Sequence, residues 1–227
     1  MSAQPKIAPD APVYVYELPV RLWHAVNALS VVVLAVTGYL IAHPLATPEG
    51  EASANFLMGY IRFAHFAAAY VFAVGFLGRV YWAFAGNHHA RELFIVPVHR
   101  PAWWDGLWHE LRWFFFLDSA PRRYLGHNPL AQLSMFAAFT LGAVFMIGTG
   151  FALYGEGEGQ GSWQDRLFGW IIPLFGQSQD VHTWHHLIAW VLVWFVMIHV
   201  YIAIREDKMS GQSMLKTIAT GWRSFKG

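Results

Sequence analysis

Long runs of apolar residues dominate the chain, and each is long enough to cross a lipid bilayer as a helix. The runs cover roughly residues 23–43, 62–84, 130–154 and 184–204. About 20 apolar residues in a helix span the ~30 Å of hydrocarbon, where every backbone N–H and C=O must be bonded internally. The pattern therefore predicts an all-α integral membrane protein, a four-transmembrane-helix bundle that forms a single domain over residues 1–227.

Between the second and third runs, residues 103–117 are rich in Trp and Phe but are interrupted by charged or titratable side chains. These are Asp105, His109, Glu110 and Arg112. Such a mixture is too polar for a fifth span and is typical of a helix that lies in the membrane–water interface. We predict one interfacial helix here.

Positive charge is distributed unevenly among the connections. It gathers in the N-terminal tail, the 85–129 loop and the C-terminal tail. The residues concerned are Lys6, Arg21, Arg91, Arg100, Arg112, Arg122, Arg123, Arg205, Lys208, Lys216, Arg223 and Lys226. The 44–61 and 155–183 loops are mainly acidic instead. Because segments rich in Lys and Arg stay on the cytoplasmic side, both termini, the 85–129 loop and the interfacial helix are predicted to be cytoplasmic.

Composition narrows the possible chemistry. The chain is 56% hydrophobic and 13% charged, has a formal net charge of +1 and contains no Cys. The low charged fraction fits the membrane class, and the net charge gives no reason to expect nucleic acid. Without cysteine, the chain itself can hold no disulfide, no thiolate-bound iron–sulfur cluster and no thioether-attached haem.

Four histidines in the apolar runs fall at two matching depths. His185 and His199 are 14 positions apart, so on a helix they lie about 40° apart on one face and about 21 Å apart along the axis. Since successive spans alternate in direction, His65 lies at the depth of His185, and His24 at the depth of His199. Two imidazoles at one depth can serve as the axial ligands of one haem iron. We therefore predict two haems b, an outer one between His65 and His185 and an inner one between His24 and His199.

Other uses of these histidines are weighed against ligation. His182 and His186 are alternatives to His185 as ligand, although His186 points about 220° away from His199. A zinc or copper site needs three or four ligands at one point, whereas these pairs are about 21 Å apart. The spans contain no Asp or Glu, which also disfavours a proton or metal transporter. Interfacial or helix-bonding histidines are the remaining alternative.

Two arginines near the ends of the second run, Arg62 and Arg79, are candidate partners for haem propionates. A guanidinium forms charge-assisted hydrogen bonds with carboxylates. Snorkelling of both side chains to lipid headgroups is the alternative.

Several stretches carry a family resemblance. They are VYELPVRLWH (15–24), TGYLI (37–41), GYIRFAH (59–65), RVYWAFAGNHHARELFIVPV (79–98), GHNPLAQ (126–132), DVHTWHH (180–186) and HVYIAIRED (199–207). Together they resemble the b-type cytochrome subunit of membrane-bound NiFe uptake hydrogenases, over nearly the whole chain. The wider group includes the cytochrome b subunits of formate dehydrogenases, but ELFIVP and HVYIAIRED favour the hydrogenase branch.

The resemblance implies an electron-transfer subunit of a bacterial inner-membrane complex, one that does not itself cleave H₂. In that family a large subunit with a nickel–iron centre and a small subunit with iron–sulfur clusters lie on the periplasmic side. The small subunit is anchored against the cytochrome, and electrons pass to the outer haem, the inner haem and then quinone. It also implies a dimer of the whole complex. The apolar spans themselves imply membrane lipids as partners.

Group-level resemblance further places a quinone site near the inner haem, at His127, Asn128 and Gln132. Each of these side chains can donate a hydrogen bond to a quinone carbonyl. The alternative is that GHNP is only a turn and helix start, with Asn128 before Pro129.

Two alternative functions stay open. One is a cytochrome b subunit of a formate dehydrogenase-type complex. The other is a haem-free membrane anchor, which would have no need of histidine pairs at matching depths.

Overall fold

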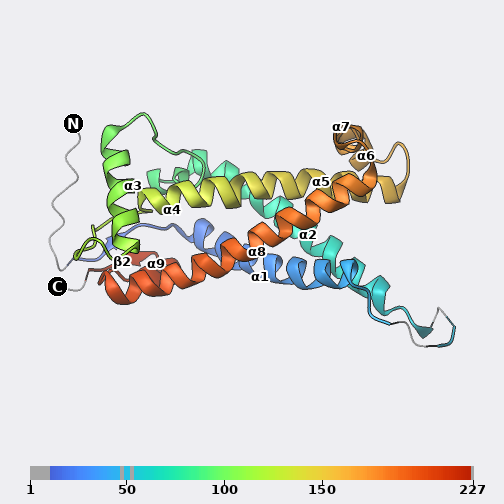
Figure 1. Cartoon of the computed structure of the whole chain (residues 1–227), viewed down its shortest axis with the longest axis horizontal. Coiled ribbons are helices and arrows are strands. Elements are labelled where there is room, and N and C mark those ends of the chain that lie inside the picture. Colours follow the sequence, from blue (N-terminus) through green and yellow to red (C-terminus); the bar gives the residue numbers. More distant parts are fainter. Residues whose placement is uncertain (1–10, 47–48, 52–53, 226–227) are drawn as a thin grey trace. The chain divides into compact units, whose positions relative to one another are not determined.

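The computed structural model describes residues 11–46, 49–51 and 54–225. The prediction that the N-terminus is cytoplasmic concerns residues 1–10, which lie outside the described part. Four helices are long and apolar enough to span a membrane: α1 (Leu18–Ala42), α2 (Leu57–Ala85), the continuous helix Pro129–Glu158, and α8 (Ser178–Met209) (Figure 1). The chain is therefore a multi-pass membrane protein, as the apolar runs predict.

Each helix extends beyond the apolar run that predicts it. α8, for example, begins at Ser178 and ends at Met209, whereas the run covers roughly 184–204. Hydropathy marks only the part of a helix that lies in hydrocarbon, and hydrogen bonding continues into the polar interface. Large apolar side chains such as Phe63 and Phe84 are exposed on the helices, which is expected where lipid is the solvent.

The third span is built from three segments. It starts with α4 (Pro129–Ser134), continues through a π-helical segment, η3 (Met135–Thr140), and ends with α5 (Leu141–Glu158). Asn128 caps α4, because its side chain accepts a hydrogen bond from the Ala131 N–H at 2.7 Å. Pro129 follows at the first helical position, where its missing N–H costs nothing.

The chain divides into two compact units. One contains the described residues up to Leu22, Tyr81–Thr140 and the segment from Phe195 onward; the other contains Trp23–Val80 and Leu141–Trp194. The first is called the mixed unit below and the second the bundle unit.

In the mixed unit a two-stranded antiparallel sheet joins β1 (Val13–Tyr14) to β2 (Trp222–Arg223), with Val13 opposite Arg223. A small apolar core lies beside it, formed by Val15, Tyr16, Val20 and Ala90. The buried Arg223 donates from Nη1 to the carbonyls of Tyr124 and Gly126 at 2.7 and 2.9 Å. The sheet is thereby bonded to the loop that precedes α4.

The mixed unit also contains the helix predicted from residues 103–117. α3 spans Pro101–Phe114 and ends before Phe116, whose φ is 58°. Its location at the membrane interface stays a prediction. Two shorter helices, η2 (His88–Arg91) and α9 (Met214–Thr220), complete this unit.

The bundle unit includes more structure than the sequence indicates between the third and fourth spans. Two short helices, α6 (Trp163–Phe168) and α7 (Ile171–Phe175), pack against α5. Gly155 of α5 permits this contact, since a Cβ there would lie 2.6 Å from the backbone nitrogen of Asp165.

Candidate functional site

His65 of α2 is held by a threonine of the neighbouring helix α1. The Thr37 hydroxyl lies 2.9 Å from Nδ1 of His65 and also donates to the Val33 carbonyl, 2.6 Å away. A hydroxyl has only one proton to donate. Because that proton goes to the carbonyl, Thr37 must accept from the N–H at Nδ1 of His65. The Nε2 lone pair of His65 is thereby available to a metal.

His185 of α8 is held in the same way by α5. Thr149 Oγ1 lies 2.8 Å from Nδ1 of His185 and donates to the Phe145 carbonyl, also at 2.8 Å. The same reasoning assigns the N–H to Nδ1 and leaves Nε2 as the lone-pair nitrogen. In metal-binding histidines the second ring nitrogen almost always donates to such a partner, which fixes the ring and its tautomer.

A glycine follows each of these threonines and lies under the imidazole. An added Cβ at Gly38 would lie 3.3 Å from Cε1 of His65, and one at Gly150 would lie 3.4 Å from Cε1 of His185. We call each threonine and glycine pair, Thr37–Gly38 and Thr149–Gly150, a Thr-Gly seat. The two seats place their histidines by the same pair of contacts.

The structure brings His65 and His185 together in the bundle unit, close enough to interact electrostatically. Both nitrogens that face away from the Thr-Gly seats have the lone pair that an iron atom requires. These residues fit one haem with two histidine ligands. Within the described residues, three metal-ligating side chains come together at His88, His89 and Glu92.

The neighbouring histidines are less suited to ligation than His185. Nε2 of His186 accepts a hydrogen bond from Trp190 Nε1 at 3.0 Å, and its ring lies 6.3 Å from that of His43. His182 is exposed, and its Nδ1 lies 3.0 Å from the Ser178 carbonyl of its own helix. Of these three histidines, only His185 makes a hydrogen bond with a residue of another long helix in the described part of the chain.

The inner pair is divided between the two units. His24 lies in the bundle unit on α1, and His199 lies in the mixed unit on α8. Both side chains are half-buried, and the His199 ring stacks on Phe195 at 5.8 Å. Their pairing stays a prediction from depth.

The two candidate propionate partners differ in burial. Arg79 is 3% exposed and lies over the Trp23 ring, 5.5 Å from its centroid, whereas Arg62 is exposed. Snorkelling therefore describes Arg62 better than Arg79.

The three candidate quinone residues lie in the mixed unit, and each makes a structural hydrogen bond. His127 Nδ1 lies 2.9 Å from Glu92 Oε2, Asn128 caps α4, and Gln132 Oε1 accepts from Trp103 Nε1 at 2.9 Å. Asn128 therefore starts a helix, as the alternative interpretation of the GHNP stretch predicts. The amide groups of Asn128 and Gln132 each carry two N–H donors, so these bonds do not exhaust their capacity.

Glu92 is a polar residue that the sequence does not single out. Burial would raise the pKa of its carboxyl, but hydrogen bonds from His127 and His89 outweigh burial and lower the pKa to about 2. The distances are 2.9 Å to His127 Nδ1 and 2.7 Å to His89 Nδ1. Both carboxylate oxygens of Glu92 accept hydrogen bonds from histidines. Glu92 therefore links η2 to the loop before α4.

A second group of buried charges joins α3 to the end of α8. Arg205 donates to Glu206 Oε1 at 3.0 Å, and Trp113 Nε1 donates to the same oxygen at 2.9 Å. The Arg205 guanidinium also lies 4.5 Å from the Phe114 ring centroid. A neighbouring acid, Glu110, is 2% exposed and accepts from Asn128 Nδ2 at 3.0 Å.

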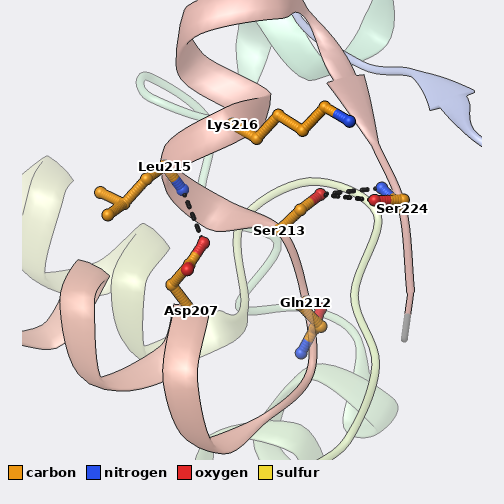
Figure 2. A pocket seen from close by; sticks show the side chains of 6 residues that line it. All are labelled: Asp207, Gln212, Ser213, Leu215, Lys216 and Ser224. Carbon is orange, nitrogen blue, oxygen red and sulfur yellow. Dashed lines mark hydrogen bonds between the residues drawn. The ribbon is translucent and has the colours of Figure 1, made fainter. Parts of the chain in front are cut away.

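The hollow shown in Figure 2, of about 340 Å³, lies elsewhere in the mixed unit. Its lining residues are Asp207, Gln212, Ser213, Leu215, Lys216 and Ser224. Hydrogen bonds join some of them, including Leu215 N–H to Asp207 Oδ1 at 3.1 Å and Ser224 N–H to Ser213 Oγ at 2.9 Å. None of the predicted site residues lines it.

Comparison with known proteins identifies the family of the chain. The family model for prokaryotic cytochrome b561 matches residues 15–221. The chain belongs to this family. A cytochrome b binds haem b, and the histidines held by the Thr-Gly seats are suitable ligands for it.

The curated relatives carry more specific names. A protein of Azotobacter chroococcum mcd 1, the "probable Ni/Fe-hydrogenase B-type cytochrome subunit", is 70% identical over 98% of this chain and 93% of its own length. A Cupriavidus necator protein of the same name is 66% identical over 94% and 87%. The "probable Ni/Fe-hydrogenase 1 B-type cytochrome subunit" of Escherichia coli K12 is 49% identical over 94% and 91%.

The Thr-Gly seats are the part of this cytochrome b561 site that sequence reasoning misses. One signal was present: within the four apolar runs the dipeptide Thr-Gly occurs at 37–38 and again at 149–150. Threonine alone is common in membrane helices, where its hydroxyl bonds the carbonyl four residues earlier. Only the fold shows that each threonine also faces a histidine.

Proposed function

We propose that this chain is a di-haem cytochrome b that passes electrons from the iron–sulfur small subunit of a periplasmic NiFe hydrogenase across the membrane to quinone, and anchors that enzyme. The pair of Thr-Gly seats is the observation that carries the haem assignment. The names and high identity of the relatives support the hydrogenase assignment. A membrane anchor without haem would need neither histidines at matched depth nor hydroxyls that fix their tautomer.

Each histidine of the outer pair has a defined role in this proposal. His65 and His185 would each offer Nε2 to a haem iron, and Thr37 and Thr149 hold the Nδ1–H tautomer. The buried Arg79 lies 14 positions after His65 on α2, near the inner end of that span, and would compensate a propionate charge of the inner haem. Arg62, at the outer end, is exposed and suits snorkelling. When bound, haem b supplies the one-electron redox chemistry at its iron.

The inner haem is assigned to His24 and His199 because they match in depth. A rise of about 21 Å between the two histidines of α8 spans most of the ~30 Å hydrocarbon. Two sites at these depths would divide the crossing into short transfers. His127, Asn128 and Gln132 bind quinone beyond the inner site.

The remaining parts of the proposal concern placement and assembly. The distribution of Lys and Arg puts both termini, the 85–129 loop and α3 on the cytoplasmic side of a bacterial inner membrane. The opposite face receives the hydrogenase large and small subunits, and the whole complex pairs as a dimer. Lipid covers the exposed apolar faces of the long helices.

The test is a reduced-minus-oxidised spectrum of the detergent-solubilised chain, with haem quantified per polypeptide. Two b-type haems are expected. One haem would overturn the inner pair first, and no haem in a folded preparation would overturn the electron-transfer function. Copurification with hydrogenase subunits, rather than formate dehydrogenase subunits, tests the partner separately.

A further inference from the structure

Glu110 has a buried carboxyl group, and only one of its two oxygens accepts a hydrogen bond from the described residues. It lies on α3 and is 2% exposed. Oε2 accepts from Asn128 Nδ2 at 3.0 Å, while Oε1 has no hydrogen-bond partner in the part of the chain that the structure describes. A buried carboxylate oxygen left unbonded is costly, whereas a protonated carboxyl keeps that oxygen neutral and able to donate.

The groups that face Glu110 do not give it a bonded cation. Arg205 of α8 is already bonded to Glu206, and Arg122 is bonded to the exposed Asp105 at 2.6 Å. His109 Nδ1 lies 3.7 Å from Oε1 of Glu110, too far for a hydrogen bond. The other facing groups are the Glu206 carboxylate and the Tyr124 hydroxyl.

This environment sets the protonation of the side chain near neutral pH. Burial, together with the charge of Glu206, raises the pKa of Glu110 to about 7, against the opposing effect of Arg122 and Arg205. Glu92 shows the contrast within the same unit, because its two histidine donors lower its pKa to about 2. Glu92 stays a carboxylate, and Glu110 can gain and lose a proton at the pH of the cell.

We propose that Glu110 is the proton donor for quinone reduction, delivering its proton to a quinone carbonyl oxygen held at Asn128. This inference rests on the proposed function. Asn128 links the two partners, since one N–H of its amide bonds Glu110 and the other is a donor for the quinone.

Reduction of quinone to quinol needs two electrons and two protons, and the electrons come from two successive one-electron oxidations of haem iron from ferrous to ferric. For each proton, the O–H bond of Glu110 breaks and an O–H bond forms at a quinone carbonyl oxygen. Glu110, left as a carboxylate, regains its proton from water before the second transfer.

The first test asks whether Glu110 holds the proton, with no quinone present. Infrared difference spectra of the full chain are recorded between pH 5 and 9, for the wild type, Glu110→Gln and Asp105→Asn. Asp105 is a matched control, because it is an acid of the same helix α3 but is exposed. A protonated-carboxyl band that titrates near pH 7 in the wild type and Asp105→Asn, and is absent from Glu110→Gln, is expected. A band unaffected by Glu110→Gln overturns the inference.

The second test asks whether the proton is used. In membranes containing the whole complex, reduction of haem b by H₂ and formation of quinol are followed separately. Glu110→Gln should leave haem reduction intact and slow quinol formation by about 10² or more, as loss of a general acid does. Glu110→Asp should recover part of the rate, with a shifted pH profile. Wild-type rates of quinol formation in Glu110→Gln overturn the inference.

Failure of the proposed function looks different. The proposed function and the proton transfer are both refuted if the wild-type chain holds no haem, or if the complex reduces haem but never quinone. The infrared titration still decides whether Glu110 holds a proton. Glu110→Gln keeps the acceptor for Asn128, and haem content checks that the variant is folded.

Discussion

Thr149 Oγ1 lies 2.8 Å from Nδ1 of His185, and the hydroxyl proton is already committed to the Phe145 carbonyl. Because the hydroxyl has no second proton to donate, it must accept a hydrogen bond from His185. Nδ1 is therefore the imidazole nitrogen that carries hydrogen. Thr37 and His65 repeat the relationship on the other two helices at 2.9 Å. The same contact between a threonine hydroxyl and a histidine Nδ1 therefore positions both candidate ligands, on four helices in all.

Replacing the threonines by valine should weaken haem binding at the outer site. Thr37→Val and Thr149→Val each remove the acceptor of an Nδ1–H, and loss of such an orienting partner typically costs 10–100-fold in metal affinity or activity. Haem retained per polypeptide across a detergent titration, together with the electron paramagnetic resonance signal of the outer haem, measures the effect. Thr183→Val is the control, because Thr183 bonds the Gln179 carbonyl of its own helix in the same way. Equal losses in all three variants would contradict the role of the seats.

Filling the glycine positions should push the imidazoles away. A Cβ at Gly38 or Gly150 already lies 3.3 or 3.4 Å from a histidine Cε1, so Gly38→Val and Gly150→Val overpack the site by about 1–3 kcal/mol. Haem content and the reduced absorption band should both change. Gly78→Val is matched in residue type and lies in α2, but nothing lies within 4 Å of its added Cβ. Normal haem content in Gly38→Val and Gly150→Val would refute the close approach.

Single histidine replacements separate the ligand from its neighbours. His185→Ala should remove the outer haem and lower the content from two haems per chain to one. His186→Ala should leave it unchanged, because Nε2 of His186 is bonded to Trp190 Nε1 at 3.0 Å. Quantifying haem as the pyridine complex distinguishes them. Loss of haem in His186→Ala with retention in His185→Ala would reverse the assignment.

Glu92 should make folding of the mixed unit sensitive to acid. Its pKa is about 2 in the folded chain, against an ordinary value of 4.5 for a glutamate carboxyl. A lowered pKa stabilises the fold above pH 4.5, here by a free energy on the order of 3 kcal/mol. This stabilisation is lost as the pH falls toward 2. Glu92→Gln should lower the thermal midpoint of the detergent-solubilised chain at pH 7 and flatten its dependence on acid pH. Replacing the exposed Glu49 by Gln should do neither.

The four spans could be predicted from the sequence because a helix in hydrocarbon satisfies its own backbone, so local composition decides the outcome. The match of His65 with His185 was predicted from the alternating direction of successive spans, and the structure does bring these two residues close enough to interact. Local reasoning could not find the contact between Thr37 and His65, since it depends on how two helices pack. Nor could it separate His185 from His186.

Other features were missed for related reasons. The short helices α6 and α7 within the 155–183 loop were not predicted, because each is only five or six residues long and packs on α5. The contact of Glu92 with His127 joins residues 35 positions apart, and neither residue alone indicates the other. His24 and His199 stay a prediction.

The pairing of Val13 with Arg223 also has a consequence for biosynthesis. A ribosome must finish nearly the whole polypeptide, with all four spans inserted, before β1 can meet its partner strand. Until then the carbonyls of Tyr124 and Gly126 lack the Arg223 guanidinium that bonds them. The loop before α4, where quinone is proposed to bind, would therefore take its final form only as the last step of folding. A chain cut short before Arg223 could insert in the membrane and bind an outer haem, yet never close this loop.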